Sequence, residues 1–213
     1  MSKPRILLAD DHKIVAEALR SLLEDEFELV DVVANGRDLV DRAGELDPDV
    51  IVADITMPNL NGIEAVKKLK DQGCRASVVF LTMHHDVAYA ARAFDAGASG
   101  FVLKNSKPEE LVAAIQAALD GRQYITPIIA GELMESYRSG DTSRLDPAAK
   151  LTTRQREVLQ LLVEGKSAKE IARALNISTR TVEFHKYRMM EELDIETSAE
   201  LIQFAIKNGI VAI

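Results

Sequence analysis

Strand-like and helix-like segments alternate along the first 120 residues, and this alternation restricts the possible folds more than any other feature of the chain. The apolar runs have the length of strands and contain almost no polar residues, as expected for strands that are covered on both faces. Five such runs are expected, at residues 5–9, 29–34, 49–54, 78–81 and 100–103. Strict alternation with helices predicts an α/β fold with a doubly wound, five-stranded parallel sheet.

The pattern changes after Gly121. A short helical piece is expected over residues 126–138, and the turn-forming residues 139–149, with almost no apolar side chains, predict a linker. Everything beyond this point has helical periodicity only. The sequence therefore predicts an α/β domain over residues 1–120, a helical segment and linker over 121–147, and an all-α domain of four helices over 148–213.

Charge is distributed unevenly between these parts. The whole net charge of −8 belongs to residues 1–150, whereas residues 151–213 contain equal numbers of acidic and basic side chains. Such a change between the halves suggests two modules with different partners. The single cysteine, Cys74, excludes an internal disulfide and suits a reducing cytosol. No apolar run approaches the roughly 20 residues that span a bilayer, so we expect a cytoplasmic protein without a membrane partner.

Polar side chains stand where the predicted strands end. Asp10 and Asp11 follow the first strand, Asp54 ends the third, and Thr82 and Lys104 end the fourth and fifth. With the strand order 2-1-3-4-5, the first and third strands are neighbours at the topological switch point, where their carboxyl ends form a crevice. Three carboxylates in one crevice repel each other unless a cation joins them. Their oxygen atoms favour Mg²⁺.

These groups suit phosphoryl transfer. An aspartate can attack a phosphoryl group and become an acyl phosphate. A metal ion and Lys104 would neutralise the oxygens of the transferred group, and Thr82 offers a hydroxyl donor. The alternative interpretation is a set of unrelated strand-end caps and a surface lysine. Four polar groups at the correct strand ends favour the functional interpretation.

Residues 1–120 resemble the receiver domain of a two-component response regulator. The resemblance rests on these residues and motifs: Asp10-Asp11, Asp54 followed by Met57-Pro58 and Gly62, Thr82, and Lys104 followed by Lys107-Pro108. It implies a flavodoxin-like fold and phosphorylation of Asp54 by a sensor histidine kinase. It further implies Mg²⁺ as the cofactor, with these ligands: Asp10, Asp11, Asp54 and the backbone carbonyl of Thr56. The implied conformational switch consists of Thr82 and Phe101, and many relatives have tyrosine at the latter position.

His84 and His85 follow Thr82 on a segment that we expect to be a loop beside the crevice. Adjacent side chains rarely face one ion, and no spaced cluster of cysteine and histidine supports a metal site here. We interpret the two histidines as residues at the rim of the site. Our hypothesis is that they affect the lifetime of the phosphoryl group or the contact with a partner.

The helix predicted over residues 179–193 has two distinct faces. One face carries Val182, Met189 and Leu193, and the opposite face carries Arg180, Glu183, Phe184 and Tyr187. Two aromatic side chains pointing away from the core indicate a face that meets a partner. Together with the preceding helix and turn, this helix resembles the second helix of a helix-turn-helix, which enters the major groove of DNA. Packing of the two rings on the first domain is the alternative.

Residues 148–213 resemble the LuxR-type helix-turn-helix domain of the NarL/FixJ class, through segments 151–159, 165–172 and 178–185. The resemblance implies promoter DNA and RNA polymerase as partners. It implies phosphate contacts from Lys169, Thr181, Lys186 and Arg188, and base contacts from Glu183, Phe184 and Tyr187, beside Arg180 on the same face. A domain without net positive charge should bind DNA weakly as a monomer. We therefore expect an active homodimer, and relatives usually pair through the helix that here carries Leu201, Ile202, Ala205 and Ile206.

Two other functional classes remain as alternatives. A phosphatase of the aspartyl-phosphate type would need a second acid two residues after its nucleophile, where this chain has Thr56. A regulator that acts only through protein contacts would have a helical module that no longer binds DNA. The sequence favours a transcription factor over an enzyme, with a receiver that promotes its own phosphorylation from a phosphodonor.

Overall fold

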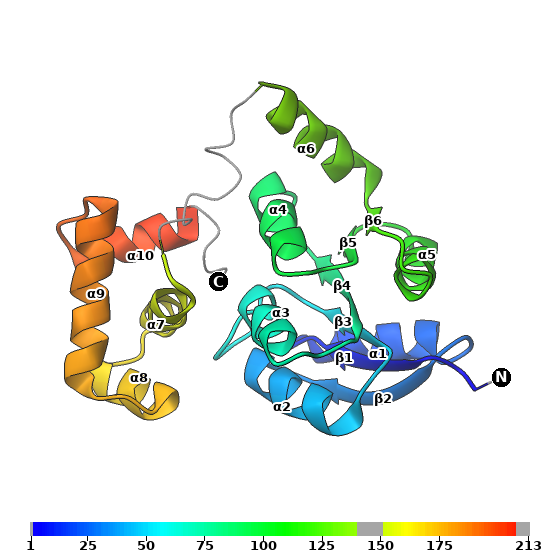
Figure 1. Ribbon diagram of the computed structural model, residues 1–213, viewed down its shortest axis with the longest axis horizontal. Coiled ribbons are helices and arrows are strands. Elements are labelled where there is room, and N and C mark those ends of the chain that lie inside the picture. Colours follow the sequence, from blue (N-terminus) through cyan, green and yellow to red (C-terminus); the bar gives the residue numbers. More distant parts are fainter. Residues whose placement is uncertain (1, 140–150, 208–213) are drawn as a thin grey trace. The chain divides into compact units, whose positions relative to one another are not determined.

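The computed structural model describes residues 2–139 and 151–207, and it is shown as a ribbon in Figure 1. The chain divides into two compact units, residues 1–145 and 146–213, and each unit is described by itself. Residues 140–149 of the predicted linker lie outside the described residues. Among the helices of the described part, none is long and apolar enough to cross a membrane.

A parallel sheet forms the centre of the first unit, with the strand order β2-β1-β3-β4-β5-β6. Its strands are β1 (Arg5–Ala9), β2 (Glu28–Val33), β3 (Val50–Ala53), β4 (Ser77–Thr82), β5 (Gly100–Leu103) and β6 (Tyr124–Ile125). The predicted α/β fold class and the order of the first five strands are confirmed. The predicted number of strands is wrong, because β6 extends the sheet beyond β5. A strand of two residues is too short to show a periodic pattern in the sequence.

Helices cover both faces of this sheet (Figure 1). One layer consists of α1 (Lys13–Leu23) and α5 (Pro108–Leu119), and the other of α2 (Gly36–Leu46), α3 (Gly62–Asp71) and α4 (Val87–Asp95). Along β1, Ile6 and Leu8 belong to the core below the first layer, whereas Leu7 and Ala9 belong to the core below the second. Burial on both faces explains why the strands read as continuous apolar runs.

The predicted helical piece after the sheet is α6 (Pro127–Ser139). Ile129 is fully buried in the core that includes α4, and Leu133 packs against Val87 and Ala91 of that helix. The backbone N–H of Leu103 donates to the Thr126 hydroxyl at 3.3 Å. The helix therefore continues the first unit rather than standing apart from it.

The described part of the second unit consists of four helices, as predicted. They are α7 (Thr153–Val163), α8 (Ala168–Leu175), α9 (Thr179–Leu193) and α10 (Ser198–Lys207). Capping boxes begin α7 and α8, and the Ser178 hydroxyl accepts from the Thr181 N–H at the start of α9. Between α8 and α9, Asn176 adopts a left-handed conformation with φ 52° and ends α8. The core holds residues from all four helices, including Val158, Ile171, Val182, Met189 and Leu201.

Candidate functional site

Three charged side chains meet at the carboxyl ends of the central strands. Asp10 follows β1, Asp54 follows β3 and Lys104 follows β5. The Lys104 Nζ atom lies 2.6 Å from Asp10 Oδ2 and 2.7 Å from Asp54 Oδ2. The two aspartates are only 3% and 4% exposed. The structure thus brings together residues that are separated by 94 positions in the sequence, because parallel strands deliver their ends to one edge.

Burial and charge pairing act in opposite directions in this cluster. Burial raises the pKa of Asp54, although the hydrogen bond and charge of Lys104 oppose the rise. Burial by itself would lower the pKa of Lys104, but the hydrogen bonds to Asp10 and Asp54 outweigh it and raise that pKa. Charge pairing outweighs burial for Lys104 but not for Asp54, because two carboxylates share one ammonium group. A further positive charge would therefore stabilise the site.

Asp11 and His12 complete the acidic cluster. One potential ligand atom from each of Asp10, Asp11, His12 and Asp54 lies within 4.8 Å of the others. The His12 N–H donates to Asp10 Oδ1 at 2.9 Å, and its Nδ1 atom lies 2.9 Å from Asp11 Oδ1. Sequence reasoning missed His12, and its position directly after the acidic pair was the available signal. The carboxylate oxygens of this set suit a hard divalent cation.

The two predicted switch residues lie inside the first unit. Thr82, at the end of β4, is fully buried, and its hydroxyl accepts a hydrogen bond from the His84 N–H at 3.2 Å. Phe101 is also fully buried and pairs in register with Phe80 across β4 and β5. Thr82 thus ends β4, the strand between β3 and β5, and Phe101 lies in the core on one face of the sheet.

His84 and His85 have different environments. The His84 Nε2 atom lies 2.8 Å from the Thr56 hydroxyl, and its ring stacks on Tyr89 with centroids 4.4 Å apart. Burial lowers the pKa of His84, which favours a neutral imidazole. His85 is exposed, and its Nε2 atom lies 3.2 Å from the Asn105 side-chain amide. His84 therefore contacts Thr56, close to Asp54 in the chain, whereas His85 does not take part in this contact.

A buried ion pair joins α3 and α4 next to this stack. Arg92 Nη2 lies 4.0 Å from Glu64 Oε1, and both side chains are less than 5% exposed. The Arg92 guanidinium also lies 5.9 Å from the centre of the Tyr89 ring. Burial raises the pKa of Tyr89 to about 12, so its hydroxyl stays protonated at neutral pH. A series of contacts therefore runs from His84 through Tyr89 and Arg92 of α4 to Glu64 of α3.

The loop between Asp54 and α3 passes very close to the site. At Gly62, the first residue of α3, a Cβ atom would lie 2.1 Å from the Asp54 carbonyl oxygen. The Gly62 N–H donates to the Ile55 carbonyl at 2.9 Å, and the Asn61 side chain caps α3 through the Glu64 N–H. A glycine is required here because only hydrogen fits between α3 and the backbone of Asp54.

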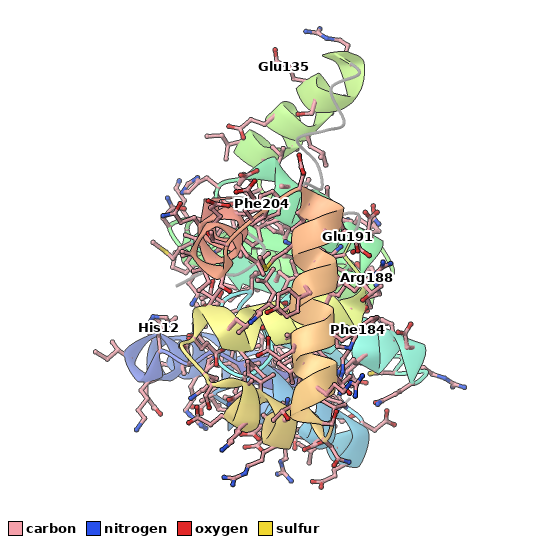
Figure 2. All side chains as sticks on the ribbon, turned by 90° about the vertical axis from the view of Figure 1, so that its left-hand side faces the viewer. His12, Glu135, Phe184, Arg188, Glu191 and Phe204 are labelled. Atoms are coloured by element: carbon pink, nitrogen blue, oxygen red, sulfur yellow. The ribbon has the colours of Figure 1, made fainter. Side chains whose placement is uncertain are left out.

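The faces of α9 agree with the helical pattern in the sequence. Val182 and Met189 are buried in the core of the second unit, whereas Phe184 is 59% and Tyr187 is 62% exposed. Arg180 and Arg188 are exposed as well. Figure 2 shows Phe184, Arg188 and Glu191 along this helix, and Phe204 on α10. An exposed aromatic pair on one face of a helix indicates a surface that meets a partner.

Most of the basic side chains on α9 take part in ion pairs. The Lys186 Nζ atom lies 2.6 Å from Glu183 Oε2 and 5.0 Å from the centre of the Tyr187 ring. Arg188 lies 3.1 Å from Glu191 and 3.5 Å from Glu192. Of the other predicted phosphate contacts, Lys169 is exposed, and the Thr181 hydroxyl lies 2.8 Å from that of Ser178. The family resemblance implied phosphate contacts from these residues, but the sequence did not show that Lys186 and Arg188 are paired with carboxylates.

Polar contacts hold α7 against α8 and α9. Arg154 donates to the Leu175 carbonyl at 2.6 Å, and the Gln155 amide donates to Glu192 at 2.8 Å. Burial and the charge of Arg154 lower the pKa of His185. The C-terminal helix α10 packs in the same core through Leu201 and Ala205, whereas Ile202 is half-buried and Ile206 is 42% exposed. Of these four residues, only Ile202 and Ile206 therefore reach the surface of this helix.

Two family models match the chain. The model described as the response regulator receiver domain matches residues 6–116, and the model described as bacterial regulatory proteins of the luxR family matches residues 149–205. Among curated proteins, the chain is 37% identical to the transcriptional regulatory protein DesR of Bacillus subtilis, over 96% of this chain and 97% of DesR. It is 35% identical to the transcriptional regulatory protein MctR of Rhizobium johnstonii, over 99% of this chain and 96% of MctR.

Solved structures give the same result. A two-component response regulator of the LuxR family from an Aurantimonas species is 41% identical, with a TM-score of 0.62, over 64% of this chain and 99% of that one. RcsB of Salmonella enterica serovar Typhimurium, bound to a promoter in the presence of the phosphomimetic BeF3−, is 27% identical with a TM-score of 0.67. That match covers 97% of this chain and 100% of RcsB. The similarity therefore includes both units.

Proposed function

Because the chain belongs to the two-component response regulators with a LuxR-type DNA-binding domain, and is a transcriptional regulator, we propose that phosphorylation of Asp54 controls its binding to promoter DNA. The observation that supports this most is the position of Lys104, whose ammonium group contacts both Asp10 and Asp54. The proposed boundaries are a receiver over residues 1–120, a connecting segment over 121–147 and a DNA-binding domain over 148–213.

The phosphoryl donor in this proposal is a phosphohistidine of a sensor histidine kinase. A carboxylate oxygen of Asp54 attacks the phosphorus atom, the bond between phosphorus and the donor nitrogen breaks, and the product is an acyl phosphate on Asp54. Lys104 neutralises the charge on the phosphoryl oxygens, since it already contacts Asp54 at 2.7 Å. The receiver thereby promotes its own phosphorylation from this phosphodonor.

The acidic cluster fits Mg²⁺. Asp10, Asp11 and Asp54 offer carboxylate oxygens close together, and two of these carboxylates share a single lysine, so the cluster has excess negative charge. These three side chains and the backbone carbonyl of Thr56 would hold the ion. When bound, Mg²⁺ supplies additional charge neutralisation for the transferred group. The Thr56 N–H donates to Asp54 Oδ1 at 3.3 Å, which holds this backbone segment beside the carboxylate.

Thr82 and Phe101 carry the proposed switch. The Thr82 hydroxyl can donate a hydrogen bond to a phosphoryl oxygen on Asp54. This movement would pull on the backbone of His84, whose N–H donates to the same hydroxyl. Phe101 has no hydroxyl, so in this chain its response depends on packing against Phe80 and its other neighbours in the core. The surface formed by β4, α4 and β5 would change as a result.

In the second unit, α9 would enter the major groove of promoter DNA. Glu183, Phe184 and Tyr187 would face base edges, with Arg180 beside them, and Lys169, Thr181, Lys186 and Arg188 would contact phosphates. An active homodimer on paired half-sites would compensate for the lack of net positive charge in residues 151–213. The exposed part of α10 around Ile206 is available for pairing. RNA polymerase would be the downstream partner, in the cytoplasm.

Labelling of the full chain with acetyl phosphate and Mg²⁺ tests the site assignment. Intact-mass and peptide mass spectrometry should find one acyl phosphate, on Asp54, and none in the Asp54→Asn variant. Asp71→Asn is the matched control, because Asp71 is an exposed residue at the end of α3 and the change removes one carboxylate of the same unit. Stoichiometric label on another residue of the Asp54→Asn protein would contradict the assignment.

A further inference from the structure

The recognition surface of α9 presents an acidic group where a DNA-binding surface is usually basic. Glu183 and Lys186 form an ion pair of 2.6 Å, but their side chains are unequally accessible: Glu183 is 41% and Lys186 is 18% exposed. The ammonium group of the lysine also lies over the Tyr187 ring, 5.0 Å from its centre. A molecule approaching this face therefore meets the carboxylate of the pair more readily than the ammonium group.

This geometry has a cost for DNA binding in general. A carboxylate brought near phosphates is repelled, and a lysine that is paired with it cannot neutralise a phosphate. Residues 151–213 have no net positive charge to offset the repulsion. The cost disappears only where a base offers a hydrogen-bond donor to the carboxylate, and the N4 amino group of cytosine is such a donor in the major groove.

We propose that Glu183 determines specificity by exchanging partners: at the correct base it leaves Lys186 for a cytosine amino group, and the released Lys186 then binds a phosphate. This inference rests on the proposed DNA-binding role of α9. Residues 183 and 186 are one turn apart on the same face, so one can face a base edge while the other faces the backbone of the same groove. On incorrect DNA, opening the pair would leave the Glu183 carboxylate close to phosphates without a hydrogen-bond donor, so the pair stays closed. Both the base contact and the phosphate contact are then missing. Specificity then arises from a penalty against wrong sequences as well as from a contact with the right one.

The exchange makes a distinctive prediction for the dependence of affinity on salt. Each phosphate contact adds about 0.9 to the slope of log K against log salt. In the native protein the slope should be steeper on the selected duplex than on a scrambled duplex by about one contact, because Lys186 is released only on the selected sequence. Glu183→Gln frees Lys186 on every sequence, so its two slopes should be equal.

The experiment uses the full chain in the presence of BeF3− and Mg²⁺, with a library of randomised DNA duplexes as the probe. The native protein should select a motif that contains a cytosine at one position per half-site. Glu183→Gln should lose that preference and bind a scrambled duplex more tightly, so that its discrimination falls about tenfold. Lys186→Met should weaken binding to the selected duplex only, because the paired lysine makes no phosphate contact on other sequences.

Glu196→Gln is the matched control, because it removes one exposed carboxylate just beyond α9 and should leave the selected motif and both slopes unchanged. Equal salt slopes for the native protein on selected and scrambled duplexes would overturn the inference. A Lys186→Met variant that weakens binding equally on both duplexes would overturn it as well. If the native protein selects no motif at all, the proposed function itself fails and the inference fails with it.

Discussion

Two lysine–carboxylate pairs of nearly equal length occur in the two units of this protein. Lys104 lies 2.7 Å from Asp54 at the carboxyl edge of the sheet, and Lys186 lies 2.6 Å from Glu183 on α9. Their environments differ strongly. The side chains of the first pair are 8% and 5% exposed, and those of the second are 18% and 41% exposed.

Burial decides what each pair can do. An exposed ion pair contributes only about 0–1 kcal/mol, so its members can change partners at little cost. Removing one member of a buried pair leaves an uncompensated charge in a medium of low polarity, at a cost of several kcal/mol. The buried pair is therefore suited to hold a reacting group in place. The exposed pair is suited to open when a better partner arrives.

Lys104→Met tests the buried pair and should have the largest effect. Loss of the ammonium group leaves Asp10 and Asp54 together without their shared partner, which should lower the free energy of unfolding by about 3 kcal/mol. Phosphorylation of Asp54 by acetyl phosphate should slow by about 100-fold. Urea unfolding followed by circular dichroism and the rate of labelling are the two measurements.

Lys107→Met is the control for this change, because Lys107 is an exposed lysine three residues further along the chain. It should alter neither quantity appreciably, since surface substitutions usually change stability by no more than about 0.5 kcal/mol. A Lys104→Met protein with native stability and a native labelling rate would show that the buried pair does not differ from the exposed one.

Gly62→Ala tests whether the backbone of Asp54 is held as tightly as its side chain. The added methyl group would lie 2.1 Å from the Asp54 carbonyl oxygen, so α3 or the loop must move. We expect a loss of about 2 kcal/mol in the free energy of unfolding and slower labelling of Asp54. Gly44→Ala in α2 is the control, because beyond the backbone of its own helix and its chain neighbours no atom lies within 4 Å of the added methyl group. This change should be neutral or stabilising by about 0.5–1 kcal/mol. Equal stability of the two variants would argue against a close approach of α3 to the backbone of Asp54.

Phe184→Ala tests the exposed region. Because its ring is 59% exposed, we expect a change in stability of no more than about 0.5 kcal/mol, but a loss of about tenfold in affinity for the selected DNA. Val182→Ala, two residues earlier on the same helix, should do the opposite, since Val182 is 1% exposed and its truncation mainly destabilises the unit. Fluorescence anisotropy with labelled duplex and urea unfolding separate the two effects. Unchanged affinity of Phe184→Ala would refute its assigned role.

His84→Ala and His85→Ala should have the smallest effects and show how far the influence of the buried site extends. His84→Ala removes the stack on Tyr89 and the hydrogen bond with Thr56, which should cost about 1 kcal/mol of stability and change the decay rate of the acyl phosphate several-fold. His85→Ala should change neither quantity, because that side chain is exposed and its hydrogen bond of 3.2 Å is made with the likewise exposed Asn105. Decay followed by loss of labelled phosphate gives the comparison. The opposite ranking would move the kinetic role to His85.

The residues of the first site were predictable because they end strands. Once the sequence indicates a parallel sheet of known order, the carboxyl ends of β1, β3 and β5 must lie along one edge of it. From β5 the long Lys104 side chain reaches Asp10 and Asp54 at this edge. The two faces of α9 were predictable for a similar reason, since helical periodicity alone separates Val182 from Phe184.

Features that depend on pairing between side chains were not predictable in this way. Glu64 and Arg92 look like ordinary solvent-facing residues of helices, but they form a buried pair between α3 and α4. The contact of His84 with Thr56 depends on the conformation of two loops, which no periodic pattern describes. The strand β6 has two residues and no pattern of its own, so its place beside β5 appears only in the folded chain.

The central claim is that the state of Asp54 controls binding of α9 to DNA, and the affinity of the full chain for its selected duplex with and without BeF3− tests it most directly. We expect BeF3− with Mg²⁺ to raise the affinity of the native protein at least about tenfold, and to leave the affinity of the Asp54→Asn variant unchanged. If the native protein and the Asp54→Asn variant bind equally, with the same response to BeF3−, Asp54 does not control DNA binding and the account is contradicted.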